Sequence, residues 1–498
     1  GCPTGHLFLW GGRCLDISRK AADQVCWALL ALGTLCSCTV NPVTGKTDFA
    51  LRSEESEISL GRKYHQQIIN RIAPLANEEL QQYVQSVGQQ VAANSHRSHL
   101  QFTFTVLDSP DINAFALPGG YVYINRGLLV YLQSEAQLAG VLAHEVGHVT
   151  ARHGVQQESY GSLLDLVTKA AELAEGNEQV VELGGLIGKA VITGYGRDME
   201  LQADELGAQY LALTGYDPQA MVEVIGVLKN REDFSRLRQQ DVGGTATNYH
   251  GLFASHPTND TRLNQIVSKA QALVANAVKQ EDRRAFLRHL EGVTFGDSSA
   301  NGIRRGNRLY HKDLNIAFEF PEGWLIENGS EQIVGIPRGE AGKAYLAVQV
   351  RATHGQTTPQ QYLAGLKLGT MLDSMRISAS GLDGHTALVQ TAKRTRVRIA
   401  VVYHQLNAYI FLGEAINIRK YDPLFLDTIE NTHRLRTEEA ALAEPLVISL
   451  LLAGDDTRYA DLGAGSALKY YPEQQLRLLN GHYPDGQPKL GQWLKLVD

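Results

Sequence analysis

The stretch that decides the fold lies at residues 134–154 and reads SEAQLAGVLAHEVGHVTARHG. Ser134 followed by Gln137 is typical of a helix N-terminus, and Gly154 is a residue that can end a helix in the left-handed conformation. The residues between them are mostly good helix formers. Since Leu138, Val141 and Leu142 are apolar, the sequence predicts a helix over these residues that is buried.

Within this helix lie His144, Glu145 and His148, in the pattern His-Glu-x-x-His. A separation of four residues puts both imidazoles on one face of a helix, one turn apart, so both can bind one metal ion. Glu145 is rotated around the helix and suits a general base. On a surface helix these side chains would simply be solvated, whereas on a buried helix they are costly without a metal. We interpret His144 and His148 as zinc ligands and Glu145 as the base.

A catalytic zinc site needs a third protein ligand as well as an open position. Glu200 is the best candidate, on a predicted helix that ends near Thr214 and Gly215. Asp204 falls one turn further along the same face and can accept a hydrogen bond from a ligand histidine. From spacing alone, a pair of exposed helix charges explains Glu200 and Asp204 equally well. We interpret His153 as a helix-end packing residue rather than a ligand.

Strand patterns occur before this helix and again in the second half of the chain. Residues 102–107 alternate and residues 121–124 are β-branched and aromatic, so a small sheet is expected before the motif helix. Residues 314–320, 345–352, 396–403 and 408–414 have strand composition, and residues 358–366 and 423–436 look helical. Residues 161–193, between the two ligand helices, are amphipathic, and we expect them to form core or a lid rather than a membrane span.

The composition excludes a nucleic-acid partner for the chain as a whole. The 498 residues carry a net charge of −7 and a sequence pI of about 6.2, and no basic stripe stands out. The five cysteines all lie at or before residue 38, which excludes a disulfide-stapled body.

The N-terminal region has the pattern of a signal peptide. Residues 25–35 form an apolar run after Arg19 and Lys20, about half as long as a bilayer-spanning helix. Residues 35–38, Leu-Cys-Ser-Cys, resemble a bacterial lipobox, which implies cleavage before Cys38 and acylation of that cysteine. Ordinary cleavage near Ser37 is the alternative. Residues 1–18 fit neither pattern, and we interpret them as the product of a misplaced translation start.

These motifs, taken with others in the same order, resemble the HtpX and CAAX-prenyl-endopeptidase family of HExxH zinc metallopeptidases, in its soluble periplasmic lipoprotein branch. The resemblance covers residues 41–290. The matching segments are residues 41–46 (NPVTGK), 113–120 (NAFALPGG), 144–148 (HEVGH), 200–204 (ELQAD) and 255–257 (SHP), followed by Arg262.

The resemblance assigns further roles. It implies that Glu200 is the third ligand of one Zn²⁺ per chain. It implies that His256 lies near the metal, as a resting-state ligand or a contact of the tetrahedral intermediate; a loop histidine before a proline turn is the alternative. Arg262 would pair with a carboxylate or polarise the substrate carbonyl. The strand after Pro118, with Gly119, Gly120, Tyr121 and Val122, would offer its edge to an extended polypeptide, although tyrosines on a strand are more often core.

Two weaker resemblances concern the rest of the chain. Residues 320–324, FPEGW, with a late helix at 425–435, resemble the PsbP and Mog-type α+β fold, which implies binding or scaffolding. Residues 441–498 are similar to a LysM-like module, which implies contact with peptidoglycan.

The expected fold class is therefore α+β and multidomain. We expect a signal peptide (1–38), a mainly helical gluzincin-type metallopeptidase domain with a small sheet (39–295), a linker (296–308), a PsbP-like domain (309–440) and a LysM-like module (441–498).

The predicted function is that of a zinc-dependent endopeptidase of the bacterial cell envelope, acting on misfolded or unassembled proteins. Its lipid anchor would hold it at a membrane, and Thr39 after Cys38 favours outer-membrane sorting if the host follows the enterobacterial rule. The alternative is a metal-binding scaffold or chaperone whose peptidase activity is latent or lost.

Overall fold

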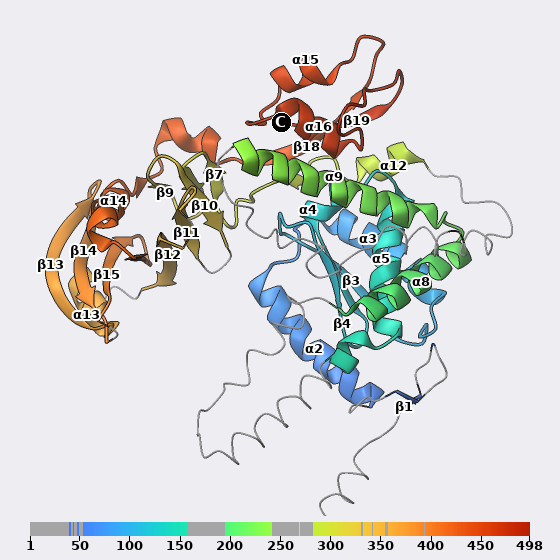
Figure 1. Ribbon diagram of the computed structural model, residues 1–498, viewed down its shortest axis with the longest axis horizontal. Helices are drawn as coiled ribbons and strands as arrows, with labels where there is room; N and C mark the ends of the chain where they lie inside the picture. The colour runs from blue at the N-terminus through green and yellow to red at the C-terminus, as the bar shows by residue number, and fades with distance from the viewer. Residues whose placement is uncertain are drawn as a thin grey trace, which may run out of the picture.

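The computed structural model describes residues 53–157, 195–241 and 282–498, apart from 330–331, 341, 354–356 and 393, together with residues 39–40, 43, 47–48 and 268. Two bodies lie side by side in Figure 1, and a small C-terminal module lies against the first of them. The first body is mainly helical, whereas the second is built on sheets. The predicted α+β multidomain fold is confirmed.

The first body packs helices against a small sheet. Its long helices are α2 (Glu54–Arg71), α3 (Glu78–Ala93), α5 (Glu135–Thr150), α8 (Arg197–Thr214) and α9 (Gln219–Asp241). Its sheet contains β3 (Thr103–Leu107), β4 (Ala114–Leu117) and β5 (Tyr121–Asn125), and the short helix α4 (Arg126–Leu129) follows β5. A separate hairpin pairs β1 (Thr39–Val40) with β2 (Thr47–Asp48).

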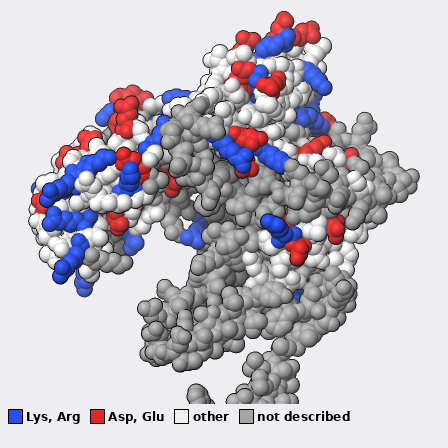
Figure 2. All heavy atoms as spheres, viewed as in Figure 1, with Lys and Arg blue, Asp and Glu red and all other residues white. Residues whose placement is uncertain are grey.

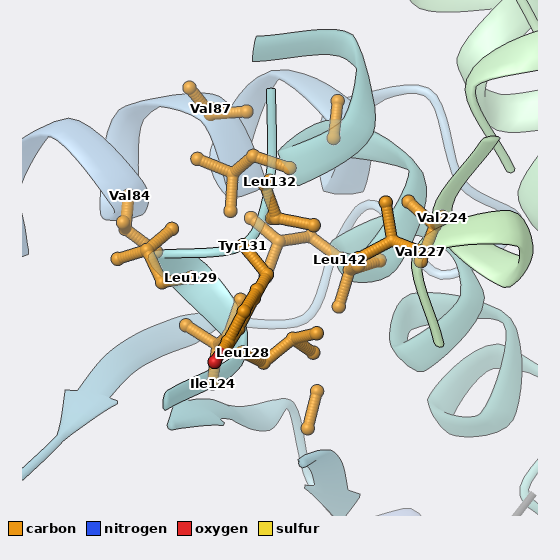
Figure 3. Packing of buried hydrophobic residues seen from close by; sticks show 14 of the residues in the cluster. Val84, Val87, Ile124, Leu128, Leu129, Tyr131, Leu132, Leu142, Val224 and Val227 are labelled. Carbon is orange, nitrogen blue, oxygen red and sulfur yellow. The ribbon is translucent and has the colours of Figure 1, made fainter. Parts of the chain in front are cut away.

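The centre of this body is apolar and surrounds α5. Val84 and Val87 of α3, Leu142 of α5 and Val224 and Val227 of α9 all lie in the cluster of Figure 3. Their spacings of three residues place each pair on one face of its helix. The motif helix is therefore held from several sides, as its apolar first half predicted.

Strand β5 is the middle strand of the sheet. The order is β3-β5-β4, with β3 parallel and β4 antiparallel to β5. Tyr121 pairs with both Thr103 and Leu117, and Val122 pairs with both Phe104 and Ala116. The prediction that the strand after Pro118 offers its edge to a substrate is therefore wrong. Among the described strands, β4 is the one at the edge next to α5.

The second body contains a seven-stranded antiparallel sheet and a four-stranded sheet. The strand orders are β10-β11-β12-β16-β15-β14-β13 and β17-β9-β8-β7. The strands of the larger sheet are β10 (Trp324–Asn328), β11 (Ile333–Pro337), β12 (Ala344–Ala352), β13 (Thr370–Ala379), β14 (Leu382–Gln390), β15 (Arg396–His404) and β16 (Asn407–Ala415). Those of the smaller sheet are β7 (Ile303–Arg305), β8 (Arg308–His311), β9 (Ile316–Glu319) and β17 (His433–Arg434).

Two helices complete the second body, on opposite faces of the larger sheet. They are α13 (Pro359–Gly365) and α14 (Ile418–Glu430). Leu363 of α13 packs in one apolar cluster and Phe425 of α14 in another. All four predicted strand segments and the helix predicted at 358–366 are present, whereas the helix predicted at 423–436 begins earlier and ends at Glu430, before β17. The segment predicted as a linker contains β7, which pairs with β8, so its second half is part of this body. Figure 2 shows acidic and basic side chains interspersed over the second body and the C-terminal module in that view.

The C-terminal module has the order β18 (Leu446–Leu452), α15 (Tyr459–Ala464), α16 (Pro472–Leu479) and β19 (Trp493–Val497). Its apolar residues, including Leu476 and Leu494, belong to the same core cluster as α5. β18 also pairs with β6 (Thr294–Phe295), the strand that follows α12 (Arg283–Arg288). The module is therefore continuous with the core of the first body.

A buried lysine joins the module to the segment that leads into α5. Lys495 is fully buried, and its Nζ donates hydrogen bonds to the carbonyls of Val130 and Leu132, each at 2.6 Å. Gln133 donates to the carbonyl of Leu479 at 2.9 Å. The residues just before the motif helix are thus fixed by polar contacts with the module.

Candidate metal centre

Helix α5 begins where the sequence predicted and ends slightly earlier. The Ser134 side chain accepts a hydrogen bond from the Gln137 amide, and the last helical residue is Thr150. Gly154 does not take the left-handed conformation. Arg152 takes it instead, with φ of 60°, and residues 153–157 resume as helix. The prediction about Gly154 is therefore wrong.

Helix α8 crosses α5 at two small residues. A Cβ at Gly147 would lie 2.8 Å from the carbonyl oxygen of Ala203, and a Cβ at Gly207 would lie 3.1 Å from the backbone nitrogen of His144. Because neither position has a side chain, the two backbones approach closely. This crossing brings Glu200 and Asp204 against the motif histidines. As predicted, α8 ends at Gly215, which is left-handed with φ of 89°.

His144, His148 and Glu200 converge on one point. The Nε2 atoms of the two histidines are 3.0 Å apart. Glu200 places one carboxylate oxygen 3.6 Å from His144 Nε2 and the other 3.5 Å from His148 Nε2. Ligand atoms bound tetrahedrally at about 2.0–2.1 Å from zinc lie about 3.3 Å from each other. The three side chains therefore fit one metal ion, and they are the one such group of His, Cys, Asp and Glu among the described residues.

Asp204 orients His144 from behind. Its Oδ1 lies 2.9 Å from His144 Nδ1, so the ring donates from Nδ1 and leaves the Nε2 lone pair for a metal. Burial alone would lower the pKa of His144, but its hydrogen bonds and charge interactions with Asp204 and Glu200 raise that pKa well above its ordinary value. Metal binding there has to displace a proton.

His148 is held in a similar way by residues that sequence analysis did not place in the site. His148 Nδ1 lies 2.9 Å from Nδ1 of buried His153, whose Nε2 lies 3.0 Å from the Gln202 side-chain oxygen. The Tyr195 ring stacks on His148, with ring centroids 4.0 Å apart. The interpretation of His153 as a packing residue missed both hydrogen bonds, and only the one to Gln202 depends on α8. His153 lies five residues after His148, which the sequence alone could have flagged.

Glu145 is buried in the same region, with a relative exposure of 1%. A pocket opens beside His148, and its lining also includes Glu57, Pro118, Arg152 and Tyr195. Pro118 directly follows β4, and Arg152 lies just beyond α5, so the pocket lies between the end of the edge strand and the end of α5.

The remaining predicted site residues are of two kinds. Gly119 and Gly120 form the left-handed turn between β4 and β5, with φ of 82° and 97°, and Tyr121 and Val122 follow in β5. His256, Arg262 and Cys38 lie outside the described residues, as does segment 161–193. Within the part of the chain that the structure describes, no helix has the length and apolar character to cross a membrane.

The sequence from the start of α3 to beyond the end of α9 matches a known family. Residues 78–270 match the sequence model of peptidase family M48. This region is similar to an M48 peptidase domain. It contains all three residues of the candidate metal centre, Glu145, and also His256 and Arg262.

Two curated relatives each match part of the chain. The beta-barrel assembly-enhancing protease of Yersinia pestis is 28% identical over 242 residues, which are 47% of this chain and 47% of that protein. The mitochondrial metalloendopeptidase OMA1 of Arabidopsis thaliana is 34% identical over 131 residues, 26% of each chain. The chain spans about half the length of the bacterial relatives it matches.

A solved structure is similar to part of the chain. The cyanobacterial PsbP protein of Synechocystis matches with 12% identity and a TM-score of 0.22, over 27% of this chain and 93% of that one. With so low a TM-score, the α+β assignment of the second body comes from its own strands and helices.

Proposed function

We propose that this chain is a zinc-dependent endopeptidase of the bacterial cell envelope that cleaves misfolded or unassembled proteins. The observation that carries the proposal is the convergence of His144, His148 and Glu200, with Glu145 buried on the same helix. The M48 domain, which includes these four residues, supports it. The bacterial relative named as a protease that enhances β-barrel assembly supports the envelope and the substrate class.

In the proposed reaction, each residue of the site would have a separate role. A bound zinc ion would polarise the scissile carbonyl and lower the pKa of water. His144, His148 and Glu200 would hold the ion, while Asp204 and His153 keep both imidazoles in the tautomer that leaves Nε2 free. Glu145 would take the proton of the attacking water and pass it to the leaving amine. His256 and Arg262 would contact the intermediate or the substrate carbonyl.

The substrate would bind as an extended strand. Because β5 is central in its sheet, the strand that can pair with a substrate beside the metal centre is β4, the outer strand that packs next to α5. The turn at Gly119 and Gly120, with Tyr121 and Val122 beyond it, would set the end of this strand rather than pair with the substrate itself. Main-chain pairing is indifferent to side chains, which suits an enzyme with varied unfolded substrates.

The location and further partners are part of the same proposal. Cleavage before Cys38 and acylation of that residue would anchor the chain in a membrane, the outer membrane if the host follows the enterobacterial rule. The C-terminal module would contact peptidoglycan. Mass spectrometry of the protein purified from its host, with and without Cys38→Ala, would show whether Cys38 carries a lipid.

The first experiment measures zinc content and proteolysis of casein for the wild type and Glu145→Gln. We expect one zinc per chain in both proteins, with cleavage by the wild type alone, since Glu145 is the base and not a ligand. Glu205→Gln is the matched control, because Glu205 is exposed on α8. A wild type that holds zinc but cleaves no unfolded protein would favour the metal-binding scaffold. Absence of metal from both proteins would refute the central claim.

A further inference from the structure

Three segments of the first body meet at one buried carboxylate, that of Glu57. This residue lies in the first turn of α2 and has no exposed surface. Arg97 donates to it from both terminal nitrogens, at 2.8 and 3.2 Å, and Arg152 donates from Nε at 2.9 Å. The amide of Gly119 completes the set at 3.4 Å. A buried charge with so many donors is fixed in position.

The partners of Glu57 belong to the two elements that the proposed reaction must align. Arg152 directly follows α5, and Arg97 also donates to the carbonyl of Val149 in the last turn of that helix, at 3.1 Å. Gly119 lies in the turn at the end of β4. One carboxylate therefore joins the end of the metal-binding helix to the end of the edge strand.

The backbone around this junction leaves little freedom to move. A Cβ at Gly61 of α2 would lie 1.8 Å from the carbonyl oxygen of Pro118. A Cβ at Gly119 would lie 2.8 Å from Cα of Ile58. Helix α2 and the turn after β4 are thus in direct backbone contact on one side, while Glu57 ties them to α5 on the other. A change at Glu57 is therefore passed on to β4 rather than absorbed by side chains.

We propose that Glu57 is a positioning residue for peptide binding: it fixes the edge strand β4 relative to α5, so that a substrate paired with β4 reaches the metal centre in register. This inference rests on the proposed function. Glu57 lines the pocket beside His148, but its side chain is buried and its carboxylate accepts hydrogen bonds from Arg97, Arg152 and Gly119. Its effect acts through Gly119 and Arg152, and a displacement of β4 by a fraction of an ångström is enough to misplace a scissile bond.

The test measures peptide affinity and zinc affinity separately, in full-length Glu145→Gln protein, where peptide is bound and not cleaved. The probe is a fluorescein-labelled extended peptide of casein, followed by fluorescence anisotropy. Adding Glu57→Gln keeps the shape of the side chain and removes its charge. We expect peptide affinity to fall at least about tenfold and zinc affinity to change less than about twofold, because no metal ligand is touched.

Two further variants guard against a simple loss of folding. Glu57→Asp keeps the charge for the arginines but ends one bond short of the Gly119 amide, and it should weaken peptide binding by an intermediate factor with an unchanged melting temperature. Glu54→Gln is the matched control. Glu54 is half-exposed and pairs with Arg97 and His99, with no described contact to Gly119 or Arg152, so peptide affinity should stay within about twofold.

The outcomes separate this inference from the proposed function. Unchanged peptide affinity in both Glu57 variants, or parallel losses of zinc and peptide affinity, would overturn the positioning role. If Glu145→Gln with Glu57 intact binds zinc but no peptide, the proposed function fails first and the inference falls with it. A selective loss of peptide binding in the Glu57 variants alone supports it.

Discussion

The close crossing of α5 and α8 makes Gly147 a sharp test of how the metal centre is built. In Gly147→Ala the new Cβ would lie 2.8 Å from the carbonyl oxygen of Ala203, whereas ordinary contacts begin at 3.4 Å. Helix α8 must therefore move by the difference of about 0.6 Å, while ligand positions tolerate only about 0.2 Å. Glu200 lies one turn from Ala203 and moves with it.

The expected result is a loss of zinc affinity with little loss of stability. Alanine gains about 1 kcal/mol over glycine in a helix, and overpacking costs about 1–3 kcal/mol, so the free energy of unfolding should fall by no more than about 2 kcal/mol. Zinc affinity, measured by competition with a chromophoric chelator, should fall at least about tenfold.

Gly140→Ala on the same helix is the matched control. Its Cβ would meet nothing closer than 3.4 Å, at the Met221 side chain, so it should bind zinc as the wild type does. If Gly147→Ala binds zinc as tightly as the wild type, or if Gly140→Ala loses as much, the crossing does not set the ligand geometry.

Three further predictions use other contacts. Asp204→Asn should weaken zinc binding about 10–100-fold by chelator competition, and exposed Glu205→Gln should not; equal effects would remove Asp204 from its orienting role. Burial lowers the pKa of Lys495 in the folded protein well below its ordinary value of 10.5. At pH values between the folded and the unfolded pKa, the unfolded chain binds one more proton than the folded chain, so the free energy of unfolding rises with pH, by at most about 1.4 kcal/mol per pH unit. Urea unfolding at several pH values should show this slope diminish in Lys495→Met and persist in Lys489→Met; an unchanged slope in both contradicts it. Leu494→Ala should cost about 2–5 kcal/mol, with zinc release and unfolding in one transition; separate transitions would show that the module is independent.

The sequence predicted most of the metal centre because, within a helix, the spacing of two residues in the sequence fixes their relative position. His144 and His148 share a face whatever surrounds them. Glu200 could not be placed by spacing alone, since its meeting with them depends on how α8 crosses α5. That crossing is set by Gly147 and Gly207, whose effect lies in the absence of a side chain. The hydrogen bond between His153 and Gln202 could not be predicted for the same reason, because Gln202 lies on α8.

The errors in the fold also concern contacts between distant segments. Alternation shows which faces of a strand are buried, but not which neighbours pair with its two edges, so β5 was taken for an edge strand when it is central. Lys495 in the run WLKLV would be expected to face solvent. It is buried because the segment before α5 covers it and offers two carbonyls.

The pairing of β6 with β18 places the second body as an insertion within the first. Phe295 pairs with Leu446, so 150 residues (296–445) leave and return at neighbouring points. Closing a flexible loop of that length costs about 4 kcal/mol of chain entropy. A second body that folds first brings the two ends together and removes that cost beforehand. During synthesis, residues 446–497 emerge after the inserted body, and the buried Lys495 that donates to Val130 and Leu132 is among them. The contacts between the module and the segment before α5 can therefore form only after the inserted body has been synthesised.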